Sequence, residues 1–97
     1  MDSARLQEVL SWVAANVVRL RRRRGLTQEA LAERAGVEVR TVQAIERGRT
    51  NVSVRYLLAF ADALGVDMRQ LLKPARLAPA RPGRPKKAKP KAAVRRR

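Results

Sequence analysis

The chain has 97 residues, with 23 Lys and Arg against 8 Asp and Glu, and a formal net charge of +15. It contains no Cys and no His, which excludes a disulfide framework, a thiolate nucleophile, a Cys-ligated zinc site and the usual proton shuttle at neutral pH. Its apolar runs fall far short of the ~20 residues that a membrane helix needs, and the N-terminus lacks the pattern of a signal peptide. We expect a cytoplasmic protein that binds polyanions, with no cofactor, no metal and no enzymatic activity.

Charge and proline divide the chain into two parts. Residues 1–72 carry 12 basic and 8 acidic side chains, a balance of +4, whereas residues 73–97 carry 11 basic and no acidic side chains. All five prolines lie in the second part. Because residues 75–97 have no apolar face, they cannot form a core. We expect one small folded unit followed by a disordered basic tail, which we place at residues 74–97.

Hydrophobic spacing predicts helices and no strands. The first helix spans about residues 6–24, because its apolar residues recur four and three positions apart, at Leu6, Leu10, Val13, Val17 and Leu20. This helix is longer than a small packed domain needs. We therefore treat residues 1–12 as an N-terminal extension that is available to a partner.

Capping residues bound the other helices. Thr27, Ser53 and Asp67 suit N-caps, and a glycine follows each of the first four helices. Pro74 stops the last one. These signals predict further helices at about residues 27–35, 38–47, 53–64 and 67–72.

The stretch from Gln28 to Arg47 has the plan of two helices joined by a short turn. Ala32 is small where the second helix must cross closely, and Gly36 suits the positive φ of the turn. Apolar residues fill every position that must lock the two helices together, namely Leu31, Ala35, Val37, Val42 and Ile45.

GLTQEALA at residues 25–32 and IERGR at residues 45–49 resemble the lambda-repressor/Cro-type helix-turn-helix domain, also called the xenobiotic-response-element family. The resemblance covers roughly residues 13–72, and its last two helices match LGVD at residues 64–67 and the leucines that follow. It implies an all-α, compact five-helix bundle, with a DNA-binding domain at residues 13–73. It also implies binding of double-stranded DNA as a homodimer, most often as a repressor.

In the docking mode of this family, the third helix lies in the major groove. The resemblance therefore predicts base contacts from Val39, Arg40, Gln43 and Ala44. Arg40 can pair with guanine and Gln43 with adenine, while the two apolar residues can contact a thymine methyl group. The alternative is that Arg40 and Gln43 are ordinary polar side chains facing water.

The resemblance and the helix dipole place Gln28 against a DNA phosphate. Further phosphate contacts are expected at Thr41, Arg47, Arg49, Thr50 and Asn51. The alternative for Arg49 and Asn51 is that they belong to an ordinary polar loop and make no contact with DNA.

The family pattern pairs an Arg late in the first helix with a Glu late in the third, which implies a partly buried ion pair between Arg21 and Glu46. For Arg22, Arg23 and Arg24, two alternatives stay open: their side chains face either DNA phosphates or solvent. The three aromatic residues Trp12, Tyr56 and Phe60 are expected in the core or in a dimer contact, and not as platforms for stacked bases.

The tail allows two interpretations. As a solvated polycation, it adds nonspecific affinity for DNA. As a sharper alternative, it resembles an AT-hook, in which an Arg lies along a narrow A·T-rich minor groove. The residues concerned are Arg81, Gly83, Arg84, Pro85, Lys86 and Lys87. The tail departs from the AT-hook pattern at Pro82, where that motif has an Arg.

Together these features predict a sequence-specific transcriptional regulator, most simply a dimeric repressor at the bacterial nucleoid. Two alternatives stay open: the DNA-binding antitoxin of a toxin–antitoxin pair, which would add a toxin as protein partner, and a nucleoid-associated protein that coats A·T-rich DNA.

Overall fold

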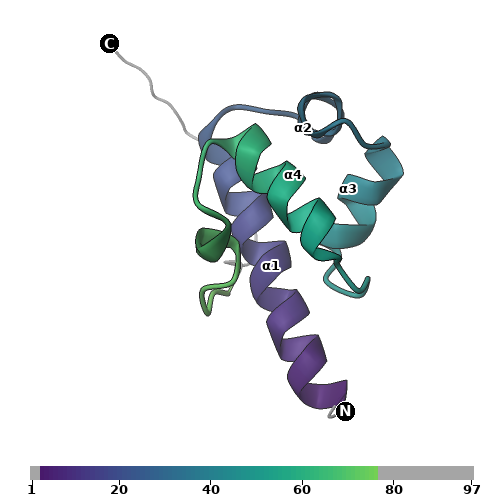
Figure 1. Ribbon diagram of the computed structural model, residues 1–97, viewed down its shortest axis with the longest axis vertical. Coiled ribbons are helices and arrows are strands. Elements are labelled where there is room, and N and C mark those ends of the chain that lie inside the picture. Colours follow the sequence, from purple (N-terminus) through teal and green to yellow (C-terminus); the bar gives the residue numbers. More distant parts are fainter. Residues whose placement is uncertain (1–2, 77–97) are drawn as a thin grey trace, which may run out of the picture.

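The computed structural model describes residues 3–76, and these residues form helices and no strands. Four α-helices are followed by one short 3-10 helix: α1 (Ser3–Arg23), α2 (Gln28–Ala35), α3 (Val39–Glu46), α4 (Val54–Leu64) and η1 (Met68–Leu71). The all-α fold predicted from the sequence is therefore confirmed. Figure 1 shows α4 crossing α1, with α2 and α3 on one side of this pair and η1 on the other.

The prediction of a fifth α-helix at residues 67–72 is wrong, because this segment forms the 3-10 turn η1. Its backbone bonds span three residues, from Gln70 N to the Asp67 carbonyl at 2.9 Å and from Leu72 N to the Arg69 carbonyl at 3.1 Å. Lys73 precedes Pro74 and is thereby disfavoured in the α conformation. The segment is too short to settle into the wider α-helical turn.

Side-chain caps fix where the helices begin. Thr27 Oγ1 accepts a hydrogen bond from Ala30 N at 3.0 Å, and Ser53 Oγ accepts one from Tyr56 N at 3.2 Å. The N-caps predicted at these two residues are confirmed. Gly36 ends α2 in the left-handed conformation, with φ of +72°, which an L side chain adopts only with strain.

Asp67 caps η1 by accepting a hydrogen bond from Arg69 N, and its carboxylate also forms an ion pair with the Arg69 side chain. The Arg69 guanidinium donates to both carboxylate oxygens, at 3.0 and 3.1 Å, and Arg69 N donates to Oδ1 at 2.8 Å. The side-chain bonds first, and the backbone bond second, lower the pKa of Asp67 from 3.8 to about 2. Because the folded state favours the ionised carboxylate, this contribution to stability is complete above pH 3.8 and is lost as the pH falls through about 2.

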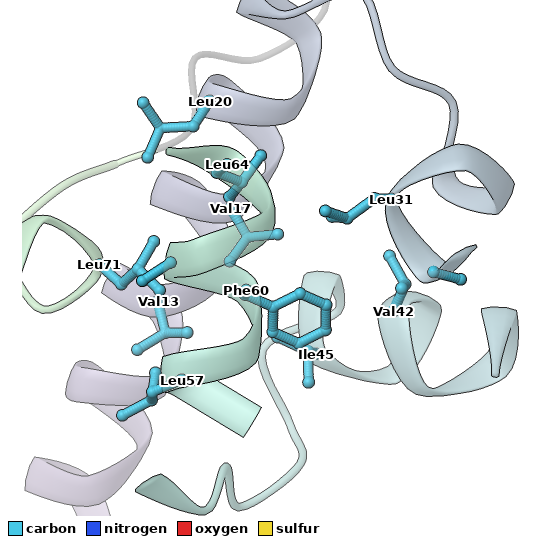
Figure 2. Packing of buried hydrophobic residues seen from close by; sticks show 12 residues of the cluster. Val13, Val17, Leu20, Leu31, Val42, Ile45, Leu57, Phe60, Leu64 and Leu71 are labelled. Carbon is cyan, nitrogen blue, oxygen red and sulfur yellow. The ribbon is translucent and has the colours of Figure 1, made fainter. Parts of the chain in front are cut away.

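The core forms where all five elements meet. Phe60 is fully buried at its centre, with Val13 and Val17 of α1 on one side and Val42 and Ile45 of α3 on the other (Figure 2). Burying each such side chain contributes about 1.5–3 kcal/mol. This core fixes α3 against α1 and α4, and so decides which face of α3 is left outside.

One buried residue in this core is polar. Asn16 is 1% exposed, and its Nδ2 donates to the carbonyls of Leu71 and Lys73, each at 3.0 Å. Arg19 Nη2 donates to the Asn16 Oδ1 at 3.1 Å. The Asn16 amide therefore attaches the end of the folded unit to the middle of α1.

We expect Asn16→Ala to lower the free energy of unfolding by about 1–3 kcal/mol, because two carbonyls lose their donor. Urea denaturation would measure this change. Ser11→Ala on the same helix is the matched control, since the Ser11 hydroxyl is exposed and bonds only within its own helix, to the Glu8 carbonyl. Equal effects of the two substitutions would contradict this role of Asn16.

Candidate nucleic-acid interface

The turn between α2 and α3 sets the two helices at a fixed angle. Gly36 turns the chain, and Val37 N donates to the Ala32 carbonyl at 3.0 Å. Leu31 and Ala32 of α2, like Val42 and Ile45 of α3, are buried. Both helices thus bury one side, and the opposite side of α3 lies at the surface.

Of the four nominated base contacts, Arg40 and Ala44 lie directly on the outer side of α3. Arg40 is exposed, and Gln43 and Ala44 are half-buried; Arg40 and Ala44 lie opposite the buried Val42 and Ile45 on the helical wheel. Val39 is half-buried too, but it packs against the core, which leaves less of its side chain to reach a base.

Arg40 is held by a surface ion pair. Its Nε donates to Glu38 Oε1 at 2.9 Å, and the two side chains are 83% and 72% exposed. Ion pairs of this kind contribute little free energy in water. The Arg40 guanidinium is therefore able to exchange Glu38 for another hydrogen-bonding partner.

Arg21 and Glu46 lie in contact behind this surface. Arg21 Nε donates to Glu46 Oε2 at 2.6 Å and Nη2 donates to Oε1 at 3.2 Å, while Nη1 donates to the Leu26 carbonyl at 2.9 Å. The side chains are only 11% and 6% exposed. This bidentate pair joins the end of α1 to the end of α3 and to the loop that precedes α2.

Gln28 belongs to the same network. Its Nε2 donates to Glu46 Oε1 at 2.9 Å, and its Oε1 lies 3.5 Å from Gln43 Nε2, at the outer limit of a hydrogen bond. One Nε2 hydrogen remains for a further acceptor. A contact between Gln28 and a phosphate stays a prediction.

The other nominated phosphate contacts fall into two groups. Thr41 and Thr50 line one shallow groove of about 310 Å³ together with Arg40, Ala44, Ile45 and Tyr56. Arg47 and Arg49 instead line a separate cleft against α1, which also includes Glu8, Trp12 and Arg76. Asn51 is exposed on the connector between α3 and α4. The sequence did not indicate this division.

Tyr56 was not nominated for the interface, yet it lies beside Arg40 and Thr41. It is 37% exposed and borders the grooves on both sides of it, one next to Gly36 and one next to Thr50. One sequence signal could have indicated this position: Tyr56 lies in the first turn of α4, three residues after the Ser53 cap. Phe60, by contrast, is wholly in the core, and Trp12 is half-buried.

The nominated tail residues Arg81, Gly83, Arg84, Pro85, Lys86 and Lys87 lie outside the described residues. Within residues 3–76, no group of three or more Asp and Glu side chains is placed to hold a metal ion. None of the helices in that range is long and apolar enough to cross a membrane.

The family model described as Helix-turn-helix matches residues 18–71. The chain belongs to the helix-turn-helix family. This is a family of DNA-binding transcriptional regulators and not of enzymes. Its matched region contains the whole of α2, α3 and α4.

Individual relatives agree with this assignment. The chain is 44% identical over 62 residues to the HTH-type transcriptional regulator y4dJ of Sinorhizobium fredii, covering 64% of this chain and 80% of the relative. The crystal structure of a hypothetical transcription factor from Neisseria matches with a TM-score of 0.68 and 36% identity, over 71% of this chain and 78% of that one. The restriction-modification controller protein C.AhdI of Aeromonas hydrophila matches with a TM-score of 0.62 and 37% identity, over 64% of this chain and 94% of that one.

We expect Arg21→Ala to lower the free energy of unfolding by about 3–5 kcal/mol, because the part-buried Glu46 carboxylate would lose its only opposite charge. Thermal or urea denaturation would measure the change. Arg22→Ala removes an exposed neighbour and should stay within about 0.5 kcal/mol of the unmodified protein. A similarly small effect at Arg21 would show that the pair does not hold α1 and α3 together.

Proposed function

We propose that this helix-turn-helix protein binds a two-fold operator as a homodimer and represses transcription by excluding polymerase from the promoter. One observation carries the proposal: α3 presents Arg40, Gln43 and Ala44 at the surface, while its other side is fixed in the core. A rigid helix with a free polar face suits the major groove. The related regulators and the restriction-modification controller favour this function over a nucleoid coat or an antitoxin.

Arg40 is the residue proposed to read sequence most strongly. Its guanidinium leaves Glu38 and donates two parallel hydrogen bonds to guanine O6 and N7. Gln43 pairs with adenine when it releases its weak contact with Gln28. Ala44 contacts a thymine methyl group, and the part-buried Val39 makes a smaller contact of the same kind.

The remaining polar residues are proposed to position the domain on the duplex. Gln28 offers its free amide hydrogen at the positive end of α2, and Thr41 and Thr50 border the same groove as Arg40. Arg47, Arg49 and Asn51 contact the phosphates that run along the connector. These contacts set the register of α3 without reading bases.

The basic tail is proposed to add affinity through phosphates or a flanking minor groove. Residues 77–97 hold nine basic and no acidic side chains. Their anchor point lies in the folded unit, because Ala75 and Arg76 line the same cleft as Arg47 and Arg49. The tail therefore starts close to side chains that we assign to phosphate contacts. The protein would act at the nucleoid, in the bacterial cytoplasm.

We expect Arg40→Ala to weaken operator binding by about 1–3 kcal/mol and to relax the preference at one base position. The operator would first be selected from random duplexes, and affinities would then be measured at fixed salt. Arg5→Ala, at an exposed position near the start of α1, is the control and should bind as the unmodified protein does. A loss of equal size on every duplex would exclude a base contact by Arg40.

Removal of residues 77–97 should leave the unfolding midpoint unchanged and flatten the salt dependence of DNA binding. Each phosphate contact that the tail makes contributes about 0.9 to the slope of log K against log salt. Binding to the operator and to unrelated DNA would be titrated over a range of salt. An identical slope for the full chain and the truncated chain would mean that the tail does not touch the duplex.

A further inference from the structure

A cleft of about 540 Å³ lies between α1 and the connector that follows α3. Its walls come from three segments that are distant in the sequence: the N-terminal half of α1, residues 46–49 and residues 75–76. Figure 1 shows this half of α1 extending beyond the other helices. Gly48 has a φ of +74°, and a Cβ there would lie 3.4 Å from the Ala14 Cβ, so the connector runs directly against α1. The cleft has the volume of a site for a small molecule.

Three guanidinium groups line this cleft without a partner of their own. Arg47, Arg49 and Arg76 are exposed, and the ion pairs formed within residues 3–76 use none of them. The Glu46 carboxylate beside them is already paired with Arg21. Unpaired guanidinium groups favour a ligand that carries phosphates, because each of them can donate two parallel hydrogen bonds to phosphate oxygens.

The α1 wall of the cleft has a different chemistry. Trp12 is half-buried there, but it does not belong to the buried cluster or to the side chains packed against it. Although the sequence favoured a packing role for Trp12, its ring is thus available to a flat ligand, and aromatic rings stack on nucleobases of any sequence. Glu8 lies one helical turn before Trp12 and is exposed in the same cleft. Its carboxylate accepts hydrogen bonds and repels phosphate.

We propose that this cleft binds a nucleoside polyphosphate, with the base stacked on Trp12 and the phosphates held by the three arginines. Glu8 accepts hydrogen bonds from amino or hydroxyl groups of the nucleoside. The two walls thus match the two ends of such a ligand, one rich in donors and the other in acceptors. Duplex DNA carries the same groups, but its bases are stacked inside the helix, where Trp12 does not reach them. A free nucleotide therefore suits the cleft better than a duplex does.

Occupation of the cleft also regulates DNA binding, and this part of the inference rests on the proposed function. Arg47 and Arg49 are assigned above to DNA phosphates, so a nucleotide that engages them withdraws them from the duplex. By linkage, the operator weakens nucleotide binding by the same factor. We expect a saturating nucleotide to lower the affinity for the operator about fivefold or more.

Trp12 allows a direct measurement, because the chain has no other Trp. Its fluorescence would be followed while the full chain is titrated with ATP, with adenosine and with tripolyphosphate. We expect ATP to bind about tenfold or more tightly than either fragment, since only ATP engages the ring and the arginines together. A protein with a net charge of +15 attracts any polyanion, so tripolyphosphate is the decisive control. Equal affinities for ATP and tripolyphosphate, or no response to millimolar ATP, would overturn the proposal.

Substitutions locate the site. Arg47→Gln and Arg76→Gln should each weaken ATP binding about fivefold or more, whereas Arg34→Gln, at an exposed position of α2 outside the cleft, should leave it unchanged. Trp12→Leu should reduce the affinity for ATP to that for tripolyphosphate, and Trp12→Phe, which retains a ring, should largely preserve it. Calorimetry would measure the Trp12 variants, and circular dichroism would verify their helices. A loss as large with Arg34→Gln as with Arg76→Gln would show general charge attraction and overturn the site.

One further comparison separates this inference from the proposed function. Operator affinity would be measured with and without ATP, for the unmodified protein and for Trp12→Leu. ATP should weaken operator binding by the unmodified protein only. If no operator can be selected from random duplexes, the proposed function fails, and the titrations without DNA still decide whether the cleft binds ATP. If ATP binds and operator affinity does not change, the regulatory role is overturned.

Discussion

The orientation of α3 depends on one part-buried ion pair, between Arg21 and Glu46. The Arg21 guanidinium donates to both oxygens of Glu46 and to the Leu26 carbonyl, so it contacts α3 and the loop leading into α2 from its own place in α1. Moving such a pair out of water costs free energy, and only complete hydrogen bonding offsets that cost. Here Gln28 supplies a further donor to the carboxylate. The pair therefore favours one relative position of three helices over neighbouring ones, whatever its net contribution to stability.

The residues that anchor α3 in the fold are different from the residue at its surface that is proposed to contact bases. Val42 and Ile45 anchor α3 from behind and Glu46 fixes its end, whereas Arg40 points outward and is engaged only with exposed Glu38. A recognition helix that is already rigid loses little conformational entropy when it meets a groove. The long Arg40 side chain remains adaptable, because it is held only by an exposed ion pair. In the proposed function, its rearrangement from Glu38 to a base would contribute most to sequence preference.

Local signals in the sequence were sufficient for α1 to α4. Apolar spacing marked their buried sides, and Thr27 and Ser53 marked starts that hydrogen bonds confirm. The last element was misassigned because a short segment with an Asp cap fits an α-turn and a 3-10 turn equally well.

The candidate interface was harder to predict from the sequence than the helices were. The outward placement of Arg40 followed from helical periodicity, but its pairing with Glu38 depends on rotamers, which periodicity does not determine. The separation of Thr50 from Arg49 depends on how an irregular connector folds. Asn16 was overlooked because it interrupts an apolar stripe as a single polar residue, and its partners lie 55 and 57 positions away.

Under the proposed function, the turn of α3 that carries Arg40 and Ala44 has an evolutionary consequence. Neither residue belongs to the buried cluster that holds the bundle together, so substitutions there alter the surface without removing a core contact. A duplicated gene could acquire a new target sequence through a few such changes while its product remained folded throughout. The architecture is thus suited to diversification, with stability and the proposed target choice encoded at different positions of one short helix.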